Sequence, residues 1–592
     1  MVVLCGIIGY IGQGEASSVL LKGLKNLEYR GYDSVGMATI SDSLNIGKGV
    51  GKIDNAMKDL DLDGLRGNIG IGHTRWATHG SVSKANAHPH IDCQGKVAIV
   101  HNGIIENHRE LRERLKEKGH IISSNTDSEV IAHLIEEKLK GASSFEEACM
   151  EAFMELQGSY AVLAICEDEK KVVAVRKDSP LVLGLAKDSI LFASDVSALL
   201  EWTKKVIYLQ NYDVAVACRR SVVFHNLLQE GEISRDADTV EWDVEQARKG
   251  EFEHFMLKEI AEQAETISKA ILQDAEVVDR IVEEVKRAKG VFFVGCGSSY
   301  HACLAGSYLF SRVAGVHVNV VVASEFGHYE HFLTEDTLVF AVSQSGETAD
   351  TLDAVRAARG RGSKVIAITN VVGSSLTREG DESLLMNSGP EICVLSTKTY
   401  TSQVVLMSLL AYALAGKKEE CIRKIKGLYM DVYNLTSKTM REELKRLASM
   451  LESMEHIYMI GRGLQYASAM EAALKVKEVS YIHTEAFAGG ELKHGPLALI
   501  EEGTPVFVFA GGESLEKISS NAQEVKARGG MVIGISTKDN DIFDYWIKVP
   551  ECGDFNPVIQ AIPMQVLAYE LAVQKELDPD KPRNLAKCVT VM

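Results

Sequence analysis

The sequence of 592 residues has no apolar run that approaches the ~18 uninterrupted residues of a membrane span. Basic side chains are fewer than acidic ones: the sequence has 64 Lys and Arg but 82 Asp and Glu, which gives a net charge of −18. Proteins that bind nucleic acid regardless of its sequence need a basic surface, so we expect no such partner. Small anionic substrates remain possible, since a local site can be positive on an acidic protein.

The 11 cysteines form no C-x-x-C pair and show no spacing typical of a zinc site; the closest two are Cys296 and Cys303. Such scattered cysteines are typical of a reducing compartment, where most of them act as small buried hydrophobes. No basic and apolar leader precedes Cys5, so we expect no signal peptide and a location in the cytoplasm. We also expect no metal site and no contact with a membrane.

The pattern of hydrophobic residues predicts more than one domain. Up to residue 240, short alternating strands are interrupted by amphipathic helices near 15–28 and 127–140, which is typical of α+β layers. Beyond it, apolar strand, turn and helix alternate, which indicates parallel sheets with crossover helices. The stretches VFFVGCGSSYHA (291–302) and IYMIGRGLQYAS (457–468) repeat this pattern, and they predict two copies of one doubly wound domain.

The fold class is therefore α/β multidomain: an α+β sandwich followed by two doubly wound parallel-sheet domains. We expect long helical stretches at 251–288 and at about 401–453. The predicted boundaries are 5–240 for the sandwich, 241–250 for a linker, 251–430 for the first repeat with its leading helix, and 445–592 for the second repeat with the C-terminal tail.

The segment SQSGET (343–348) follows the strand TLVFAV and opens a helix. A helix start offers free backbone N–H groups and the positive end of the helix dipole. Ser343, Ser345 and Thr348, with Gln344, add further donors, and Gly346 lets the backbone approach closely. An ordinary N-cap needs only one hydroxyl, so this density of donors favours a phosphate cradle, beside a second serine-rich turn at 297–299.

A second candidate site lies in EAALKVKEVSYIHTEAFAGGELKHGPLALI (471–500). Lys475 and Glu478 are three residues apart and share one face of the predicted helix. Such spacing usually means a solvated ion pair. His494 lies in a glycine-flanked loop, where polar residues often serve function, although a lone loop histidine is more often a surface residue.

These stretches carry a family resemblance. SQSGET resembles the sugar isomerase (SIS) domain family, whose members bind phosphosugars. The segment 471–500, STKTYTSQ (396–403) and the tail PRNLAKCVTVM resemble the glutamine–fructose-6-phosphate aminotransferase (isomerizing) family. The resemblance implies that Glu478 is the proton-moving base, Lys475 its supporting cation, His494 the ring-opening group supplied by a partner subunit, and Lys587 the imine-forming lysine.

The same resemblance implies a sugar-phosphate site and a dimer without cofactors. Ser298 and Val394 would line the sugar. The phosphate would be held by Ser299, Ser343, Gln344, Ser345 and Thr348. No metal or organic cofactor is required by this chemistry, and a histidine that comes from the partner implies at least a homodimer.

Four stretches of the first domain resemble class II glutamine amidotransferases, which are N-terminal-nucleophile hydrolases: CGIIGYIG (5–12), LEYRGYDSVG (27–36), GHTRWATHG (72–80) and HNGIIEN (101–107). The resemblance implies that Cys5 is the nucleophile and that Asn102 and Gly103 form the oxyanion hole. Glutamine would be held by Arg75 through its carboxylate and by Asp127 through its ammonium. The remaining implied pocket residues are Trp76, as an aromatic gate toward the ammonia passage, Thr78, His79 and His88.

The position of Cys5 departs from that family, in which the cysteine directly follows the initiator Met. A free α-amine, with a pKa of ~7.7–8.0, takes the thiol proton, whereas an amide to Leu4 has no basic lone pair. Two explanations stay open: removal of a short propeptide, and a misplaced start, in which Leu4 or a preceding Val is encoded by an alternative start codon that is read as Met; we favour the second. The chain as written should not hydrolyse glutamine.

The sequence thus predicts amination and isomerisation of fructose 6-phosphate to glucosamine 6-phosphate, with glutamine as nitrogen donor. Two alternatives remain. One is an ammonia-dependent phosphosugar aminase or deaminase with an inactive glutaminase. The other is a phosphosugar-sensing regulator that only binds its ligand, against which the joint presence of Glu478, His494 and Lys587 argues.

Overall fold

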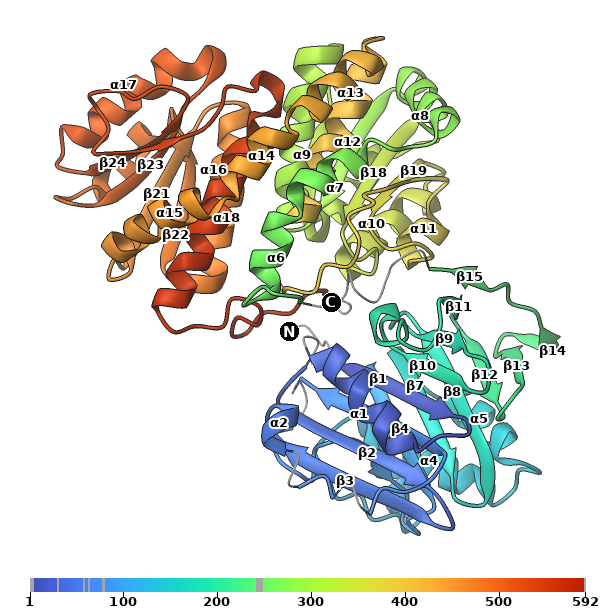
Figure 1. Cartoon of the computed structure of the whole chain (residues 1–592). Coiled ribbons are helices and arrows are strands. Elements are labelled where there is room, and N and C mark those ends of the chain that lie inside the picture. The colour runs from blue at the N-terminus through green and yellow to red at the C-terminus, as the bar shows by residue number, and fades with distance from the viewer. Residues whose placement is uncertain are drawn as a thin grey trace. The chain divides into compact units, whose positions relative to one another are not determined.

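The structure is a computed structural model that describes residues 5–28, 31–56, 59–61, 64–76, 80–240 and 249–589 (Figure 1). The chain divides into two compact units, of which the first comprises Met1–Arg248 and Ala586–Met592 and the second Lys249–Leu585. Within the described ranges, every helix is too short or too polar to cross a membrane. Residues 241–248 of the predicted linker lie outside the described residues.

The first unit contains two antiparallel sheets that face each other. Strand β6 shows why they stack: Ala98 and Val100 face the apolar layer between the sheets, whereas Val97 and Ile99 face helices on the other side. In spatial order, one sheet is β15 (Asp238–Thr239), β11 (Lys205–Tyr208), β9 (Val182–Leu185), β10 (Ile190–Ala193), β1 (Gly6–Ile11), β4 (Ile69–Arg75), β2 (Ser34–Ile40) and β3 (Leu44–Val50). The other is β14 (Gln229–Ile233), β13 (Val222–Asn226), β12 (Asp213–Ala217), β8 (Glu169–Lys177), β7 (Gly158–Cys166), β6 (Val97–Ile105) and β5 (His90–Ile91).

Helices cover the outer face of each of these sheets. Helix α1 (Ala16–Leu27) buries Leu20, Leu24 and Leu27, which share one helical face, against the first sheet. The second sheet is covered by α3 (His108–Glu117), α4 (Glu129–Leu139) and α5 (Phe145–Met154). A short helix α2 (Ile53–Ala56) completes the described helices here. The helices predicted near 15–28 and 127–140, and the layered α+β fold, are confirmed.

The second unit contains two parallel five-stranded sheets with the same strand order, so the predicted repeat is confirmed. The repeated sequence stretches form β16 with α9 (Ser298–Leu309), and β21 with α16 (Leu464–Ser480). One sheet is β17 (Asn319–Val322), β16 (Gly290–Gly295), β18 (Thr337–Ser343), β19 (Lys364–Thr369) and β20 (Glu382–Leu385). The other is β22 (His483–Ala488), β21 (His456–Gly461), β23 (Pro505–Phe509), β24 (Met531–Ser536) and β25 (Tyr545–Lys548).

The long predicted helices are divided into shorter ones. The stretch predicted over 251–288 forms α6 (Phe255–Ala261), α7 (Gln263–Ala270) and α8 (Ala275–Arg287), because Asp274 begins a new helix by accepting a hydrogen bond from Glu276 N at 2.8 Å. In the later stretch, Gly416 at φ +70° follows the end of α12 (Lys398–Leu414). The remaining helices are α10 (Ala349–Gly360), α11 (Ser375–Glu379), α13 (Lys418–Gly427), α14 (Tyr429–Leu435), α15 (Lys438–Leu451), α17 (Leu515–Lys526) and α18 (Asn556–Gln574).

The two repeats of the second unit share one hydrophobic core. Helix α16 packs against α18 and against α9, and α9 packs against α12, so helices from both repeats contact each other (Figure 1). Their buried side chains belong to a single cluster that includes Phe293 from the first sheet and Phe507 from the second. This arrangement brings the N-terminal end of α9 to helix α16.

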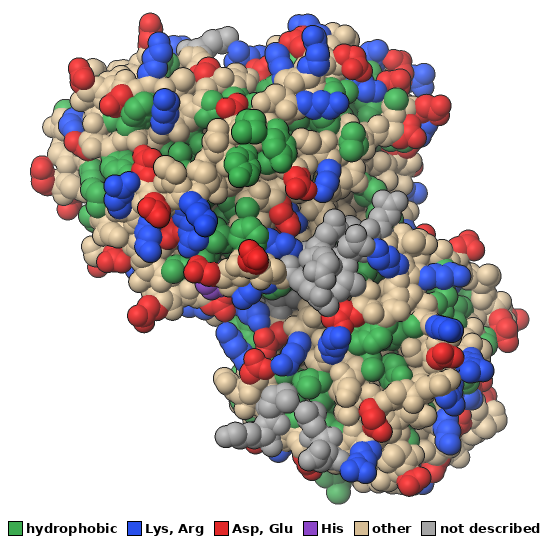
Figure 2. Space-filling view, in the orientation of Figure 1, with side chains coloured by type: hydrophobic (Ala, Val, Ile, Leu, Met, Phe, Trp, Pro, Cys, Tyr) green, Lys and Arg blue, Asp and Glu red, His purple; other side chains and the backbone are tan. Residues whose placement is uncertain are grey.

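Acidic and basic side chains are interspersed on the face of the molecule drawn in Figure 2.

Candidate active sites

In the first unit, Cys5 lies immediately before β1, whose neighbour β4 ends at Arg75. The register pairs Gly6 with Thr74, so the cysteine is placed beside Trp76. Cys5 Sγ accepts a hydrogen bond from Trp76 N at 3.3 Å and lies 3.7 Å from Trp76 O. Cys5 is buried and packs against Trp76 and Ile104.

The side chain of Asn102 on β6 forms a hydrogen bond with the backbone of Cys5. Its Nδ2 donates to Cys5 O at 2.9 Å, and His73 Nε2 lies 3.1 Å from its Oδ1 and 3.0 Å from His101 O. The histidine therefore fixes the amide with its NH₂ group toward Cys5. Gly103 follows at φ +121°, and a Cβ there would lie 2.0 Å from Ser159 O, so only glycine fits. The structure brings the predicted nucleophile and the predicted oxyanion donor together.

Three other predicted glutamine-binding residues lie near Cys5 and Asn102. Arg75 is buried, donates to Gly80 O at 3.2 Å and Ser81 O at 3.4 Å, and burial lowers the pKa of its guanidinium. Asp127 Oδ2 accepts from Ile105 N at 2.8 Å, which ties it to the strand that carries Asn102. The ring of Trp76 meets that of Tyr32 edge-on at 5.1 Å. Thr78 and His79 lie outside the described residues.

Three histidine rings lie in a row next to Asn102. The rings of His73 and His88 lie 4.0 Å apart, and those of His88 and His90 lie 4.5 Å apart. Burial lowers the pKa of His73 to about 3 and those of His88 and His90 well below their usual value, so all three are neutral. Sequence reasoning singled out His88 and missed His73, although GHTRWATHG contains it.

In the second unit, α16 of the second repeat meets the serine turn of the first. Lys475 Nζ donates to Ser298 Oγ at 2.9 Å and lies 2.8 Å from Glu478 Oε2. The Lys475 side chain is 1% exposed and that of Glu478 is 19% exposed. The pair is therefore not the solvated ion pair that its spacing usually indicates, because Lys475 is fully buried and Glu478 is only partly exposed.

Two further buried residues complete this group, and sequence reasoning missed both. Glu471 accepts hydrogen bonds from Ser298 Oγ at 2.9 Å and pairs with His301 Nδ1 at 2.8 Å. Its Oε1 also lies 3.4 Å from Lys475 Nζ. The only sequence signal was that Glu471 precedes Lys475 by four residues on one helical face.

The charge on Lys475 is set by these two carboxylates. Burial on its own lowers the pKa of a lysine, but Glu471 and Glu478 outweigh it, and the pKa of Lys475 is raised. A raised pKa favours the charged ammonium at neutral pH, whereas an imine-forming lysine needs an uncharged amine. This agrees with a supporting role beside Glu478.

The segment 343–348 joins the carboxyl end of β18 to α10, as predicted. Ser343 Oγ accepts from Gly346 N at 3.1 Å and lies 2.9 Å from Thr348 Oγ1, so the turn is held by its own hydroxyls. Gly346 has φ +67°, and a Cβ there would lie 2.2 Å from Ser374 Oγ. The loop and the N-terminus of a twelve-residue helix together form the kind of turn that binds phosphate.

The other predicted sugar-phosphate residues lie on neighbouring elements of the same unit. Ser299 Oγ, in the first turn of α9, accepts from Gln403 Nε2 at 3.1 Å. Ser345 Oγ accepts from Glu347 N at 3.1 Å, and Gln344 O accepts from Asn370 N at 3.0 Å. Val394 is buried, and its N donates to Asp580 O at 3.1 Å.

The last two predicted catalytic residues, His494 and Lys587, lie outside the helices α9 and α16. His494 is exposed at the end of a 3₁₀ turn (Glu491–His494), and among the described residues it makes no hydrogen bond or ion pair. Lys587 is half-buried and belongs to the C-terminal segment assigned to the first unit, whereas Lys475 and Glu478 belong to the second.

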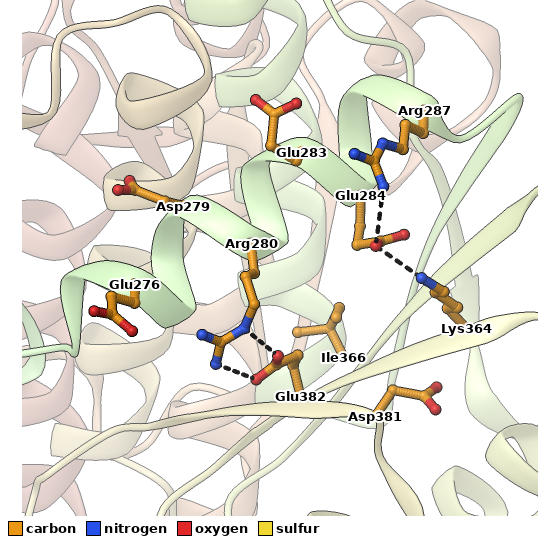
Figure 3. Close-up of a pocket in the computed structure, with 10 residues that line it drawn as sticks. All are labelled: Glu276, Asp279, Arg280, Glu283, Glu284, Arg287, Lys364, Ile366, Asp381 and Glu382. Atoms are coloured by element: carbon orange, nitrogen blue, oxygen red, sulfur yellow. Dashed lines mark hydrogen bonds and ion pairs between the residues drawn. The ribbon is translucent and has the colours of Figure 1, made fainter.

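A hollow of about 720 Å³ elsewhere on the second unit is not a sugar-phosphate site (Figure 3). It lies at the amino ends of β19 and β20, the opposite edge from the loop at 343–348. Arg280 Nε binds Glu382 Oε1 at 2.6 Å, and Lys364 Nζ binds Glu284 Oε1 at 2.7 Å, so its cations are neutralised. Its lining is Glu276, Asp279, Arg280, Glu283, Glu284, Arg287, Lys364, Ile366, Asp381 and Glu382.

The folds and these groups of residues define the class of protein: a glutamine amidotransferase domain followed by two SIS domains. The family model described as "Glutamine amidotransferase domain" matches residues 73–201 of this chain, and the family model described as "SIS domain" matches residues 284–413 and 450–575. A glutamine–fructose-6-phosphate aminotransferase (isomerizing) of Thermococcus kodakarensis is 46% identical over 99% of this chain and all of its own length. Its counterpart in Pyrococcus horikoshii is 44% identical over the same shares.

A solved structure supports the same assignment for the second unit. The C-terminal domain of glucosamine-fructose-6-phosphate aminotransferase from Francisella tularensis is 35% identical, with a TM-score of 0.52, over 57% of this chain and all of that domain. The chain belongs to the glutamine–fructose-6-phosphate aminotransferase (isomerizing) family.

Proposed function

We propose that this protein takes ammonia from glutamine at Cys5 and transfers it internally to fructose 6-phosphate, giving glucosamine 6-phosphate and glutamate. The observation that carries the proposal is the pairing, in one chain, of a buried Cys5–Asn102 site with a Ser298–Lys475–Glu478 group beside a phosphate-type loop. The full-length likeness to aminotransferases of this name supports the substrates.

At the first site, the thiolate of Cys5 attacks the carboxamide carbon of glutamine. Asn102 Nδ2 and Gly103 N stabilise the oxyanion that forms, ammonia leaves, and water hydrolyses the thioester to glutamate. The α-amine of Cys5, when free, accepts the thiol proton and later returns one to the departing ammonia. Arg75 and Asp127 bind the carboxylate and ammonium of the substrate, Trp76 closes the pocket toward the ammonia passage, and Thr78, His79 and His88 shape it.

At the second site, the phosphate binds at the N-terminus of α10, where backbone N–H groups and hydroxyls surround an anion. The phosphate ligands are Ser299, Ser343, Gln344, Ser345 and Thr348, and the sugar lies along Ser298 and Val394. His494 opens the sugar ring by moving a proton, and Lys587 holds the open keto form as an imine. After ammonia has replaced the lysine at C2, Glu478 moves a proton from C1 to C2, with Lys475 as its fixed counter-charge.

The acid–base steps need no metal or organic cofactor. We further propose a homodimer, in which the exposed His494 of one subunit serves the sugar site of the other. The scattered cysteines support a location in the cytoplasm. The rival function is an ammonia-dependent phosphosugar aminase or deaminase, motivated by the four residues that precede Cys5.

The test is product analysis with glutamine and fructose 6-phosphate, on the chain as printed and on a chain trimmed to begin at Cys5. We expect the trimmed chain to form glucosamine 6-phosphate and glutamate in equal amounts. The printed chain, if it keeps residues 1–4, should react with ammonium but not with glutamine. Activity with ammonium alone in both proteins would support the rival. Rapid glutamine turnover by a chain that verifiably keeps Leu4 would contradict the role of the α-amine.

A further inference from the structure

Four side chains with metal-binding atoms converge in the first unit, and none of them has a role in the mechanism above. Cys93 lies in the turn between β5 and β6, and His120 follows the end of α3. His133 and Glu136 lie one turn apart on α4. One donor atom from each lies within 4.8 Å of the other three. The histidines and Glu136 are buried, whereas Cys93 is exposed and offers an entry path.

The spacing between these donors matches the edges of a tetrahedron around a metal ion. Cys93 Sγ lies 3.4 Å from His133 Nδ1 and 3.7 Å from His120 Nδ1. With Zn–S of ~2.3 Å and Zn–N of ~2.0 Å, tetrahedral geometry requires about 3.5 Å. Glu136 Oε2 lies 3.0 Å from His120 Nδ1 and 3.5 Å from His133 Nδ1, where about 3.3 Å is required.

Both imidazoles turn Nδ1 toward the centre of this group, and each has a carboxylate near its Nε2. His120 Nε2 lies 3.1 Å from Glu137 Oε2, and His133 Nε2 lies 3.7 Å from Glu129 Oε1. Metal-binding histidines nearly always donate their far N–H to such a group, which fixes the ring and its tautomer. Among the described residues, the buried Nε2 of His133 has no closer hydrogen-bond partner.

We propose that Cys93, His120, His133 and Glu136 bind one divalent transition-metal ion, with zinc favoured. A thiolate, two neutral imidazoles and a carboxylate are ligands that zinc accepts, and their two negative charges neutralise its two positive charges. Four protein ligands fill a tetrahedral ion, so the site is structural and leaves no position for a substrate.

The ion would fasten three segments together. It would join the Cys93 turn, the loop that follows α3, and α4, which begins two residues after Asp127. The same loop is already held by Glu129, which accepts from Ser123 N at 2.8 Å and from Ser124 N at 2.5 Å. A hydrogen-bonded cluster without metal explains the contact of His120 with Glu136, but it does not require both histidines to turn Nδ1 toward the thiol.

The spacing of these four ligands in the sequence does not reveal the site. Its ligands are separated by 27, 13 and 3 residues, and only the last interval is a helical spacing. The expectation that the chain has no metal site rested on the absence of closely spaced cysteines, which says nothing about ligands that the fold gathers from three elements.

The test is a competitive zinc titration against a chromophoric chelator, on full-length protein carrying Cys5→Ala so that the pocket thiol does not contribute. We expect one tight site per chain, and a thiolate-to-metal charge-transfer band when cobalt(II) replaces zinc. Cys93→Ser should remove the band and the tight site. Glu137→Gln, which alters the outer partner of His120 together with the surface ion pairs of Glu137 to Lys118 and Lys140, should weaken binding about 10–100-fold.

The matched control is Cys218→Ser, a half-exposed cysteine just after β12 in the same unit; it should bind zinc like its parent. Thermal unfolding with and without zinc checks that each variant folds, and zinc should raise the unfolding temperature of every protein except Cys93→Ser. Equal zinc affinity in Cys93→Ser and its parent, or no tight site in the parent, would overturn the proposal. Neither outcome depends on aminotransferase activity.

Discussion

The hydroxyl of Ser298 and the ammonium of Lys475 are 177 residues apart in sequence and 2.9 Å apart in the structure. Ser298 begins α9 in the first repeat, and Lys475 lies on α16 in the second. The contact joins the start of α9 in one repeat to the second half of α16 in the other. A duplicated domain has thereby acquired one asymmetric site: one copy supplies the serine turn and the other supplies the charged helix.

Replacing Lys475 with Met should both destabilise the second unit and stop sugar amination. The substitution leaves Glu471 and Glu478 without their buried cation, and breaking such a pair costs about 3–5 kcal/mol. Denaturant unfolding measures the loss, and glutaminase activity of a chain beginning at Cys5 should persist. The control is Lys269→Met, whose exposed ion pair with Glu265 should cost less than about 1 kcal/mol. Equal losses in the two variants would show that Lys475 is not electrostatically coupled to its neighbours.

Replacing Gly346 with Ala should raise the KM for fructose 6-phosphate. A left-handed φ costs an alanine about 1–2 kcal/mol, and its Cβ would also collide with Ser374, which forces the loop at 343–348 to move. Steady-state kinetics with ammonium as nitrogen donor isolates this effect from the glutaminase. Gly416→Ala is the control, because φ is +70° there but the added Cβ meets no atom within 4 Å. If both variants show the same KM, the loop does not bind the phosphate.

Acid should destabilise the first unit before it protonates the buried histidines. The pKa of His73 is about 3 in the folded chain and ~6.5 when unfolded, so between these values only the unfolded chain binds the proton. The free energy of unfolding therefore falls as pH drops below about 6.5, by up to about 1.4 kcal/mol per pH unit for each such histidine. His88, whose pKa is also lowered, contributes in the same direction.

Unfolding measured at several pH values between about 8 and about 5 checks this prediction. His88→Phe removes one buried titrating group. It should reduce the dependence of the unfolding free energy on pH by up to about 1.4 kcal/mol per pH unit. His225→Phe, at a half-exposed position on β13, should leave this dependence unchanged. A flat profile in the unmodified chain would mean that the buried histidines take up protons while folded.

Local sequence patterns predicted the layers and the repeat well, because strand alternation and strand–turn–helix rhythm are short-range properties. They also placed Lys475 and Glu478 on one helical face, and the phosphate-type loop between β18 and α10. What they could not predict depends on contacts across the fold. Glu471 and His301 become one buried group only because α9 packs on α16, and no spacing in the sequence encodes that contact.

Helix boundaries failed for a similar reason. An apolar helical face can continue across a break, so the periodicity over 251–288 indicated one helix although Asp274 caps a new one. The ion pair of Lys475 and Glu478 also depends on contacts across the fold. Its spacing is typical of a solvated surface, but Lys475 is buried against Ser298 of the first repeat.

Glu478→Gln separates an enzyme from a protein that only binds sugar phosphate. The variant keeps the size of the side chain and a hydrogen-bond acceptor for Lys475, but it cannot move a proton between C1 and C2. We expect glucosamine 6-phosphate formation to fall by at least about 100-fold, while fructose 6-phosphate still binds and the unfolding temperature changes little. Isothermal titration with the substrate and a product assay with ammonium measure the two properties separately. Glu485→Gln, an exposed carboxylate on β22, is the matched control and should retain full activity. Unchanged turnover in Glu478→Gln would remove Glu478 from the chemistry and favour the phosphosugar-sensing regulator.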